Sequence, residues 1–171
     1  MKPTKHASVL NRMARKGVSA GGAKILKVLL VDDMRTMRTH ARAMLADRDY
    51  LIMEAPNGEE ALELVESCKP HLILMDIVMP KMDGVTCCRR IKSNSRLRDI
   101  KIIMVTGKGE YSQIAEAFRA GCDDYITKPI DREELLKKVD ELSKYVLCRR
   151  RLNTLLNDDT APERLPTRRK P

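Results

Sequence analysis

The sequence has no tryptophan and one phenylalanine, so aliphatic side chains and its ten methionines must fill the interior. Methionine adapts to irregular spaces, which makes such a core workable. No apolar run approaches the roughly 18 residues that a membrane-spanning helix needs. The basic N-terminus also lacks the hydrophobic segment of a secretory signal. These absences predict a soluble, cytoplasmic protein.

Paired cysteine spacing is absent as well. The five cysteines form an odd set without a C-x-x-C pair, which argues against a structural zinc site and against a disulfide framework. We expect thiols that pack in the core of a protein from a reducing compartment. The residues concerned are Cys68, Cys87, Cys88, Cys122 and Cys148.

The net charge of +9 is concentrated at the two ends of the chain. Residues 1–24 hold six basic residues and no acid, and residues 149–171 hold seven basic and three acidic residues. Residues 25–148 hold 20 basic and 21 acidic residues, a net of −1. We therefore predict a folded domain over 25–147 between a basic, flexible extension at 1–24 and a basic extension at 148–171 that is helical at first and then disordered.

The basic extensions leave one binding function open. Contact with nucleic acid or an anionic membrane would involve the tails alone and would depend steeply on salt. Residues 8–16 could form a short basic amphipathic helix on such a partner, although disorder is favoured for so brief a segment.

Strand-like and helix-like patterns alternate strictly through the central region. Apolar, largely β-branched runs predict strands at 27–31, 50–53, 71–75, 100–105 and 124–126. A helical spacing of apolar residues follows each strand. The expected helices are at 35–46, at 57–68, from the loop at 79–84 to about residue 93, at 111–120, and from Asp131 onward. Five such units predict an α/β fold with a parallel sheet, whose working residues gather beyond the C-terminal ends of the strands.

Polar residues stand at four of those strand ends: Asp32-Asp33, Asp76, Thr106 and Lys128. Converging carboxylates repel one another unless a hard cation such as Mg²⁺ binds them. A carboxylate beside that cation can act as a nucleophile toward a phosphoryl group. Lys128 would add a second positive charge, the Thr106 hydroxyl could donate to a phosphoryl oxygen, and Gly107 would leave room for the group.

Each of these residues also has an ordinary structural interpretation. Asp32 or Asp33 could cap the first helix, and Asp76 could be a solvated loop carboxylate. Thr106 could simply end a strand, and Lys128-Pro129 could form a turn. Only their joint position at one edge of the sheet favours a site.

Four segments together resemble the receiver domains of two-component systems. They are Val31-Asp32-Asp33, the stretch from Asp76 through Met79-Pro80-Lys81 to Gly84, Val105-Thr106-Gly107, and Asp124-Tyr125-Ile126-Thr127-Lys128-Pro129-Ile130. The resemblance covers about residues 26–145 and implies a doubly wound, flavodoxin-like (βα)5 fold with strand order 2-1-3-4-5.

The resemblance also implies a role for each matching residue. Asp76 would take a phosphoryl group from a phosphohistidine of a sensor histidine kinase or phosphotransfer protein. Asp32, Asp33 and Asp76 would bind Mg²⁺, together with the backbone carbonyl of Val78. Thr106 and Lys128 would contact the phosphoryl oxygens. Tyr125 would turn inward when Thr106 moves, and the Lys128-Pro129 peptide would be cis.

Two positions bear on the lifetime of the phosphoryl group, namely Val78 and Lys108. Neither offers a carboxylate or an amide that could orient an attacking water, so slow self-dephosphorylation is expected. The protein would catalyse only its own phosphoryl transfer and this slow loss, and would not turn over a separate substrate.

Few residues follow the last predicted helix, which predicts a stand-alone receiver of the chemotaxis-regulator type, without an output domain. Its output would be a contact between proteins through the helix at 111–120, the strand at 124–126 and the last helix. That helix could run on through Arg149-Arg150-Arg151 to Leu155-Leu156 as a basic docking extension, or the segment could be a solvated tail. The downstream target and any phosphorylation-dependent homodimer stay open.

Three other functions fit these residues less well. A scaffold that never carries phosphate is disfavoured by the intact Asp76, Thr106 and Lys128. A haloacid-dehalogenase-type hydrolase would need a carboxylate at the place of Val78. In a flavin-binding protein, Asp32-Asp33 would repel the flavin phosphate.

Overall fold

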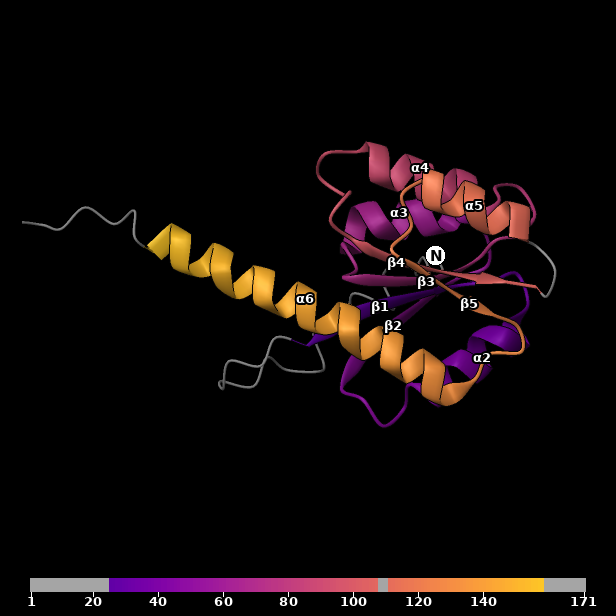
Figure 1. The fold of residues 1–171 in the computed structure, drawn as a ribbon, viewed down its shortest axis with the longest axis horizontal. Coiled ribbons are helices and arrows are strands. Elements are labelled where there is room, and N and C mark those ends of the chain that lie inside the picture. The colour runs from indigo at the N-terminus through magenta and orange to yellow at the C-terminus, as the bar shows by residue number, and fades with distance from the viewer. Residues whose placement is uncertain (1–24, 108–110, 159–171) are drawn as a thin grey trace, which may run out of the picture.

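The computed structural model describes residues 25–107 and 111–158, which form an alternating series of strands and helices (Figure 1). The extension at 1–24, with the short segment 8–16 in it, and the tail from 159 onward lie outside the described residues. The strands are β1 (Leu26–Val31), β2 (Tyr50–Ala55), β3 (Leu72–Asp76), β4 (Lys101–Thr106) and β5 (Asp124–Thr127). The helices are α2 (Arg35–Met44), α3 (Gly58–Cys68), α4 (Gly84–Ser93), α5 (Tyr111–Arg119) and α6 (Arg132–Asp158).

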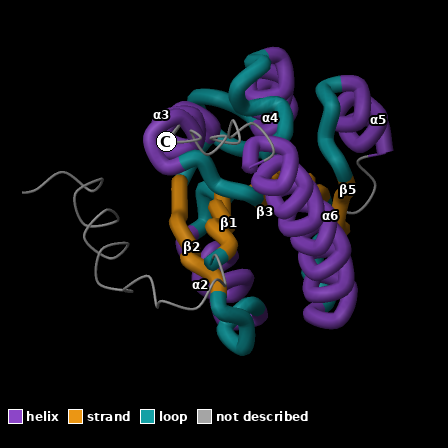
Figure 2. The backbone as a smooth tube through the Cα atoms, turned by 90° about the vertical axis from the view of Figure 1, so that its left-hand side faces the viewer, coloured by secondary structure: helices purple, strands orange, loops and turns teal. Residues whose placement is uncertain are grey.

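The strands form one parallel sheet in the order β2-β1-β3-β4-β5, which confirms the predicted topology. Strands β1, β3 and β4 are almost wholly buried, as their continuous apolar runs require in the middle of a parallel sheet. Residues of β2 alternate between buried and partly buried, because this strand lies at an edge. Figure 2 shows β2 and β5 on opposite sides of β1 and β3.

Helices cover both faces of the sheet (Figure 1). One apolar cluster joins the sheet to α3, α4 and α5, and includes Met53, Val65 and Ile91. The other joins it to α2 and α6, and includes Leu45 and Leu135. Successive side chains of a strand point to opposite faces, so β1 contributes side chains to the two clusters in alternation.

Side-chain caps fix where several helices begin. The carboxamide oxygen of Asn57 accepts hydrogen bonds from the backbone N–H groups of Glu59 and Glu60, and so starts α3 as the sequence predicts. Asp131 accepts from the N–H of Glu134 at the start of α6. The helix α6 then continues to Asp158 and extends past the sheet (Figure 1). Among the described residues, no helix is long and apolar enough to cross a bilayer.

Four of the five cysteines are buried, and only Cys148 is exposed. Burial raises the pKa of Cys87 and of Cys88 to about 12, and that of Cys122 to about 11. Because the thiolate is the reactive form, we expect iodoacetamide at about pH 8 to alkylate Cys148 first in the native protein. Mass mapping of alkylated peptides before and after unfolding checks this, and early labelling of Cys87 or Cys88 would contradict the packing described here.

Candidate functional site

The register of the sheet brings the polar strand ends together. Asp32 follows Val31, which pairs with Met75 of β3, and the next residue of β3 is Asp76. Asp76 in turn pairs with Val105, the residue before Thr106. Parallel strands end at the same edge, so residues far apart in sequence meet there.

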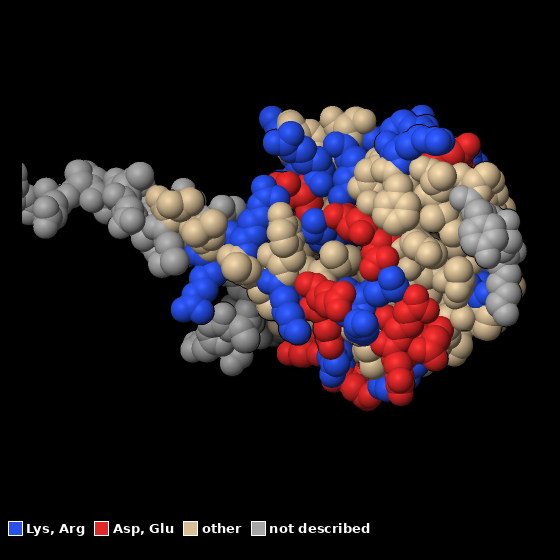
Figure 3. All heavy atoms as spheres, viewed as in Figure 1, with Lys and Arg blue, Asp and Glu red and all other residues tan. Residues whose placement is uncertain are grey.

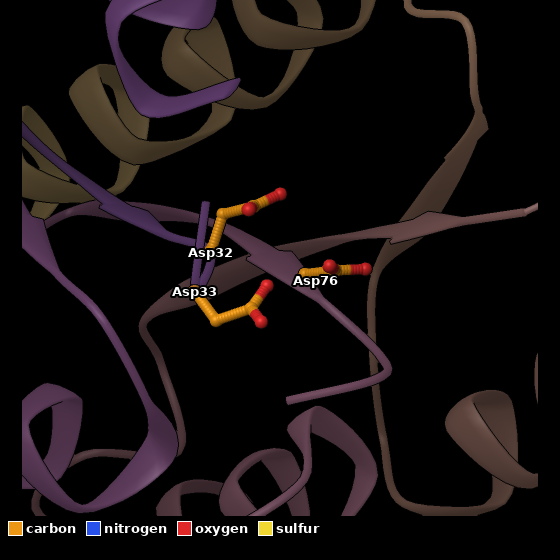
Figure 4. A group of neighbouring side chains, drawn as sticks. All are labelled: Asp32, Asp33 and Asp76. Carbon is orange, nitrogen blue, oxygen red and sulfur yellow. The ribbon is translucent and has the colours of Figure 1, made fainter. Parts of the chain in front are cut away.

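Three carboxylates converge at this edge. One oxygen from each of Asp32, Asp33 and Asp76 lies within 4.8 Å of the others. Figure 4 shows Asp32 and Asp33 leaving the end of one strand and Asp76 leaving the end of its neighbour, with their side chains extending to the same side. Asp76 is only 6% exposed and Asp32 is also buried, whereas Asp33 faces solvent. The group is therefore accessible from one side.

Lys128 supplies the positive charge opposite these carboxylates. Its Nζ donates to Asp76 Oδ2 at 2.7 Å and to Asp32 Oδ2 at 3.1 Å. The peptide bond between Lys128 and Pro129 is cis, as expected. The backbone N–H of Lys128 donates to the carbonyl oxygen of Thr106 at 2.7 Å, which links the ends of β4 and β5.

The site holds more negative charge than Lys128 can balance. Burial raises the pKa of Asp76 above its ordinary value, against the opposing effect of the hydrogen bond from Lys128. For Lys128, burial alone would lower the pKa, but hydrogen bonds to Asp76 and Asp32 raise it. Three carboxylates and one ammonium leave two negative charges unmatched in a partly buried place. An all-oxygen set with that deficit fits a hard divalent cation such as Mg²⁺.

Asp32 does not cap the first helix, which removes its ordinary interpretation. The N-cap of α2 is Met34, and no side chain caps that helix. Asp32 Oδ1 instead accepts from the backbone N–H of Met34 at 2.8 Å, and its other oxygen meets Lys128. Arg38 Nη1 donates to the backbone carbonyl oxygen of Asp32 at 2.6 Å and to that of Asp33 at 3.3 Å. Sequence reasoning did not find this role for Arg38.

The loop after β3 is held tightly beneath the site. The backbone N–H of Gly84 donates to the carbonyl oxygen of Ile77 at 2.9 Å. A Cβ atom at Gly84 would lie 2.1 Å from the backbone carbonyl oxygen of Asp76, where no side chain fits. Met82, in the same loop, accepts a hydrogen bond through its carbonyl oxygen from the N–H of Gly58. Gly84 therefore sets how closely α4 approaches the strand end that carries Asp76.

The remaining predicted residues fall in different places. Thr106 is fully buried, and its hydroxyl donates to the carbonyl oxygen of Gly107 at 3.3 Å. Tyr125 is partly exposed and packs edge-to-face on Phe118, with ring centroids 6.0 Å apart. The side chain of Val78 is 58% exposed. Lys108 lies outside the described residues.

The raised pKa of Asp76 predicts a pH-dependent effect of Asp76→Asn in Mg²⁺-free buffer. Because the folded-state pKa is raised, the contribution of Asp76 to stability is full below its unfolded-state pKa and is lost as pH rises through the folded-state value. Asparagine carries no charge to lose. We expect the variant to gain stability relative to the wild type as pH rises above about 4, the usual pKa of an aspartate in an unfolded chain. Urea unfolding at several pH values measures the difference in unfolding free energy between the two proteins. A difference that does not change with pH would contradict the raised pKa of Asp76.

Comparison with known proteins places this chain in a family. Residues 28–140 match the model of the response regulator receiver domain. The chain is 33% identical over 138 residues to the response regulator MprA of Mycobacterium ulcerans, covering 81% of this chain and 55% of that protein. It is 34% identical over 116 residues to the DNA-binding dual master transcriptional regulator RpaA of Synechocystis, covering 68% of this chain and 48% of the regulator. The chain thus spans about half the length of these curated relatives.

Solved structures show the same fold. A response regulator from Chloroflexus aurantiacus superposes with a TM-score of 0.67 at 31% identity, over 70% of this chain and 98% of that one. The chemotaxis response regulator CheY4 of Vibrio cholerae gives 0.65 at 28% identity, over 70% and 99% of the two chains. With the family model matching more than half of the sequence, the chain belongs to the receiver-domain family of two-component response regulators.

Proposed function

We propose that this receiver accepts a phosphoryl group on Asp76, in the presence of Mg²⁺, from a phosphohistidine of a sensor histidine kinase or phosphotransfer protein. One observation carries the proposal: Asp76 is nearly buried, lies 2.7 Å from the ammonium of Lys128, and shares its strand edge with Asp32 and Asp33. That combination suits a nucleophile and its electrostatic support better than a structural ion pair.

The proposed transfer makes one bond and breaks one. A carboxylate oxygen of Asp76 attacks phosphorus, and the bond between phosphorus and the imidazole nitrogen breaks, with its electron pair leaving on the imidazole. Asp32, Asp33, Asp76 and the carbonyl oxygen of Val78 would hold Mg²⁺, which supplies positive charge for the phosphoryl oxygens when bound.

The chain's own residues would do the rest of the work by positioning. The ammonium of Lys128 faces Asp76 and can stay with an oxygen of the transferred group as charge develops there. The Thr106 hydroxyl, one strand away, can turn from the Gly107 carbonyl oxygen to donate to the same group. These roles require no side chain to change its protonation state during transfer.

Val78 supports a slow loss of the phosphoryl group. Its exposed isopropyl group stands two residues after Asp76 and has no oxygen or nitrogen with which to orient water. We expect the purified phosphoprotein to decay with a half-life of minutes or longer, measured by intact mass after removal of the phosphoryl donor. A half-life of seconds would refute this expectation. The same lack of a carboxylate argues against a hydrolase of the haloacid dehalogenase type.

A surface over α5, β5 and α6 supports the proposed output through protein contacts. Phe118 and Tyr125 are exposed and pack edge-to-face, and Lys138 Nζ of α6 lies 5.6 Å from the centroid of the Tyr125 ring. Since the Lys128 backbone bonds the Thr106 carbonyl oxygen, movement of Thr106 would reach this surface through β5. A downstream protein or a second copy of the chain would read the change.

Incubation with Mg²⁺ and acetyl phosphate tests the proposal. The wild type is expected to gain the mass of one phosphoryl group, and the gain is expected to disappear on addition of a chelator. Asp76→Asn should gain nothing. Asp83→Asn is the matched control, because it removes a carboxylate from the same loop while asparagine can still cap α4 as Asp83 does. An unmodified wild type would sink the proposal and favour the scaffold function.

A further inference from the structure

The last turns of α6 leave the body of the protein at the edge opposite the phosphorylation site. The helix starts at Arg132, after β5, and runs back past the strand beginnings to Asp158 (Figure 1). Tyr145, Val146 and Arg149 of α6 line a groove there, together with residues that precede or begin strands, such as Lys27 and His71. This region is therefore separate from the site around Asp76 and from the α5–β5 surface.

An apolar stripe runs along this part of the helix. Tyr145, Arg149, Leu152 and Leu156 are spaced by four, three and four residues, which places them on one helix face over about 16 Å. Leu152 is 55% exposed and Leu156 is 59% exposed, and Tyr145 is exposed as well. The Arg149 guanidinium is held by Asp99, with 2.6 Å between Nη1 and Oδ1. We call these four residues the α6 seam.

The groove continues the α6 seam onto the body of the protein. Its volume is about 380 Å³, and its lining includes Lys27, Lys69, His71 and Asp99. Beside it, Lys101 Nζ lies 4.2 Å from the centroid of the Tyr145 ring. Even with Asp99 subtracted, the ammonium groups of Lys27 and Lys69 and the Arg149 guanidinium leave this groove positively charged.

The charges on this part of α6 select the kind of partner. Between residues 142 and 157 every charged residue is basic, and these are Lys144, Arg149, Arg150 and Arg151. Figure 3 shows Lys and Arg side chains gathered where α6 leaves the body. Arg149 lies within the seam, and the other three basic residues are spaced onto the sides of the helix farther from it, so the charge around the seam is positive. Two copies of this seam would bring like charges together, whereas an acidic helix would match them.

The concave groove favours a peptide over a lipid surface. A basic helix with an apolar face can also lie on an anionic membrane. A flat bilayer surface, however, would leave the groove next to Tyr145 unfilled, whereas the side chains of a peptide can fill it. We propose that the α6 seam and this groove bind an acidic amphipathic helix of a partner protein, whether or not Asp76 is phosphorylated.

Binding of synthetic peptides to the full chain tests this proposal. The probe is a fluorescent helical peptide with leucine at the heptad core positions and glutamate elsewhere, compared with a scrambled peptide of identical composition. The wild type is expected to bind the helical peptide and to bind the scrambled one at least about tenfold more weakly. The double variant Leu152→Glu/Leu156→Glu should lose a similar factor.

Two control variants separate the seam from general effects. Leu147→Glu adds one negative charge, half that of the double variant, to the exposed opposite face of α6 and is expected to reduce peptide affinity by far less than half the effect. The wild type is expected to bind the peptide equally with and without Mg²⁺ and acetyl phosphate, and Asp76→Asn should bind it as well, so the outcome is independent of the proposed phosphorylation. Circular dichroism of each variant shows whether α6 is still helical.

Three results would overturn the proposal. Equal binding of the helical and scrambled peptides would mean that only the net charge of the peptide matters, and not its apolar helix face. A wild-type dimer in analytical ultracentrifugation that Leu152→Glu/Leu156→Glu dissociates would assign the seam to a second copy of the chain. Sedimentation with phosphatidylserine-containing vesicles, without binding of the peptide, would assign it to a membrane.

Discussion

Replacing Lys128 with methionine is expected to slow phosphorylation of Asp76 by acetyl phosphate by about a hundredfold or more. The Lys128 ammonium is the group that donates to both Asp76 and Asp32, at 2.7 and 3.1 Å. Methionine keeps the length of the side chain but leaves the carboxylates without that donor. The transferred group would then lose a positioned charge in a partly buried site, where such interactions are strongest.

The matched control is Lys137→Met on the exposed surface of α6, which removes the same charge from a side chain outside the group formed by Lys128 and the three carboxylates. Initial rates of adduct formation at saturating Mg²⁺, followed by intact mass, compare the two variants. Lys137→Met should react as the wild type does. A Lys128→Met rate within a few-fold of the wild type would mean that the ammonium serves the fold and not the transfer.

Replacing Gly84 with alanine is expected to destabilise the protein by about 1–3 kcal/mol or more, as forced overpacking does. The added Cβ would stand 2.1 Å from the Asp76 carbonyl oxygen, a backbone atom that moves only with the end of β3. At an open helical position the same change stabilises a protein by about 1 kcal/mol. A loss of stability in Gly84→Ala, instead of a gain, would therefore show that α4 lies in close contact with the backbone of Asp76.

Urea unfolding of Gly84→Ala measures this loss, with Ser93→Ala at the other end of α4 as a nearly neutral control. We also expect Gly84→Ala to accept a phosphoryl group more slowly, because relief of the clash must shift the backbone of Asp76. Stability equal to or above that of the wild type would contradict the close approach of α4 to β3.

The fold and the main site residues could be predicted because a parallel sheet turns sequence order into spatial order. Continuous apolar runs marked β1, β3 and β4, and the polar residue after each run had to lie at one edge. The cap of α3 was equally readable, since Asn57 is followed by Glu60 three positions later. These features depend on local pattern alone.

Other features depend on tertiary contacts that no local pattern encodes. Arg38 lies one helical turn into α2 and looks like any surface arginine, yet it holds the Asp32 and Asp33 carbonyl oxygens. The need for glycine at position 84 arises from a backbone eight residues earlier in the chain. The contact of the outward Tyr125 with Phe118 joins residues of α5 and β5 and follows from no local pattern. The length of α6 was left open, since its last turns have little apolar contact with the body.

The identity of the modified residue is the most direct test of Asp76 as the phosphoacceptor. Borohydride reduces an acyl phosphate to an alcohol, so a phosphorylated aspartate becomes homoserine, which peptide mass mapping locates. After treatment with Mg²⁺ and acetyl phosphate, we predict homoserine at position 76, with Asp32 and Asp33 unchanged. Homoserine at Asp32 or Asp33, or at none of the three, would contradict the assignment of Asp76.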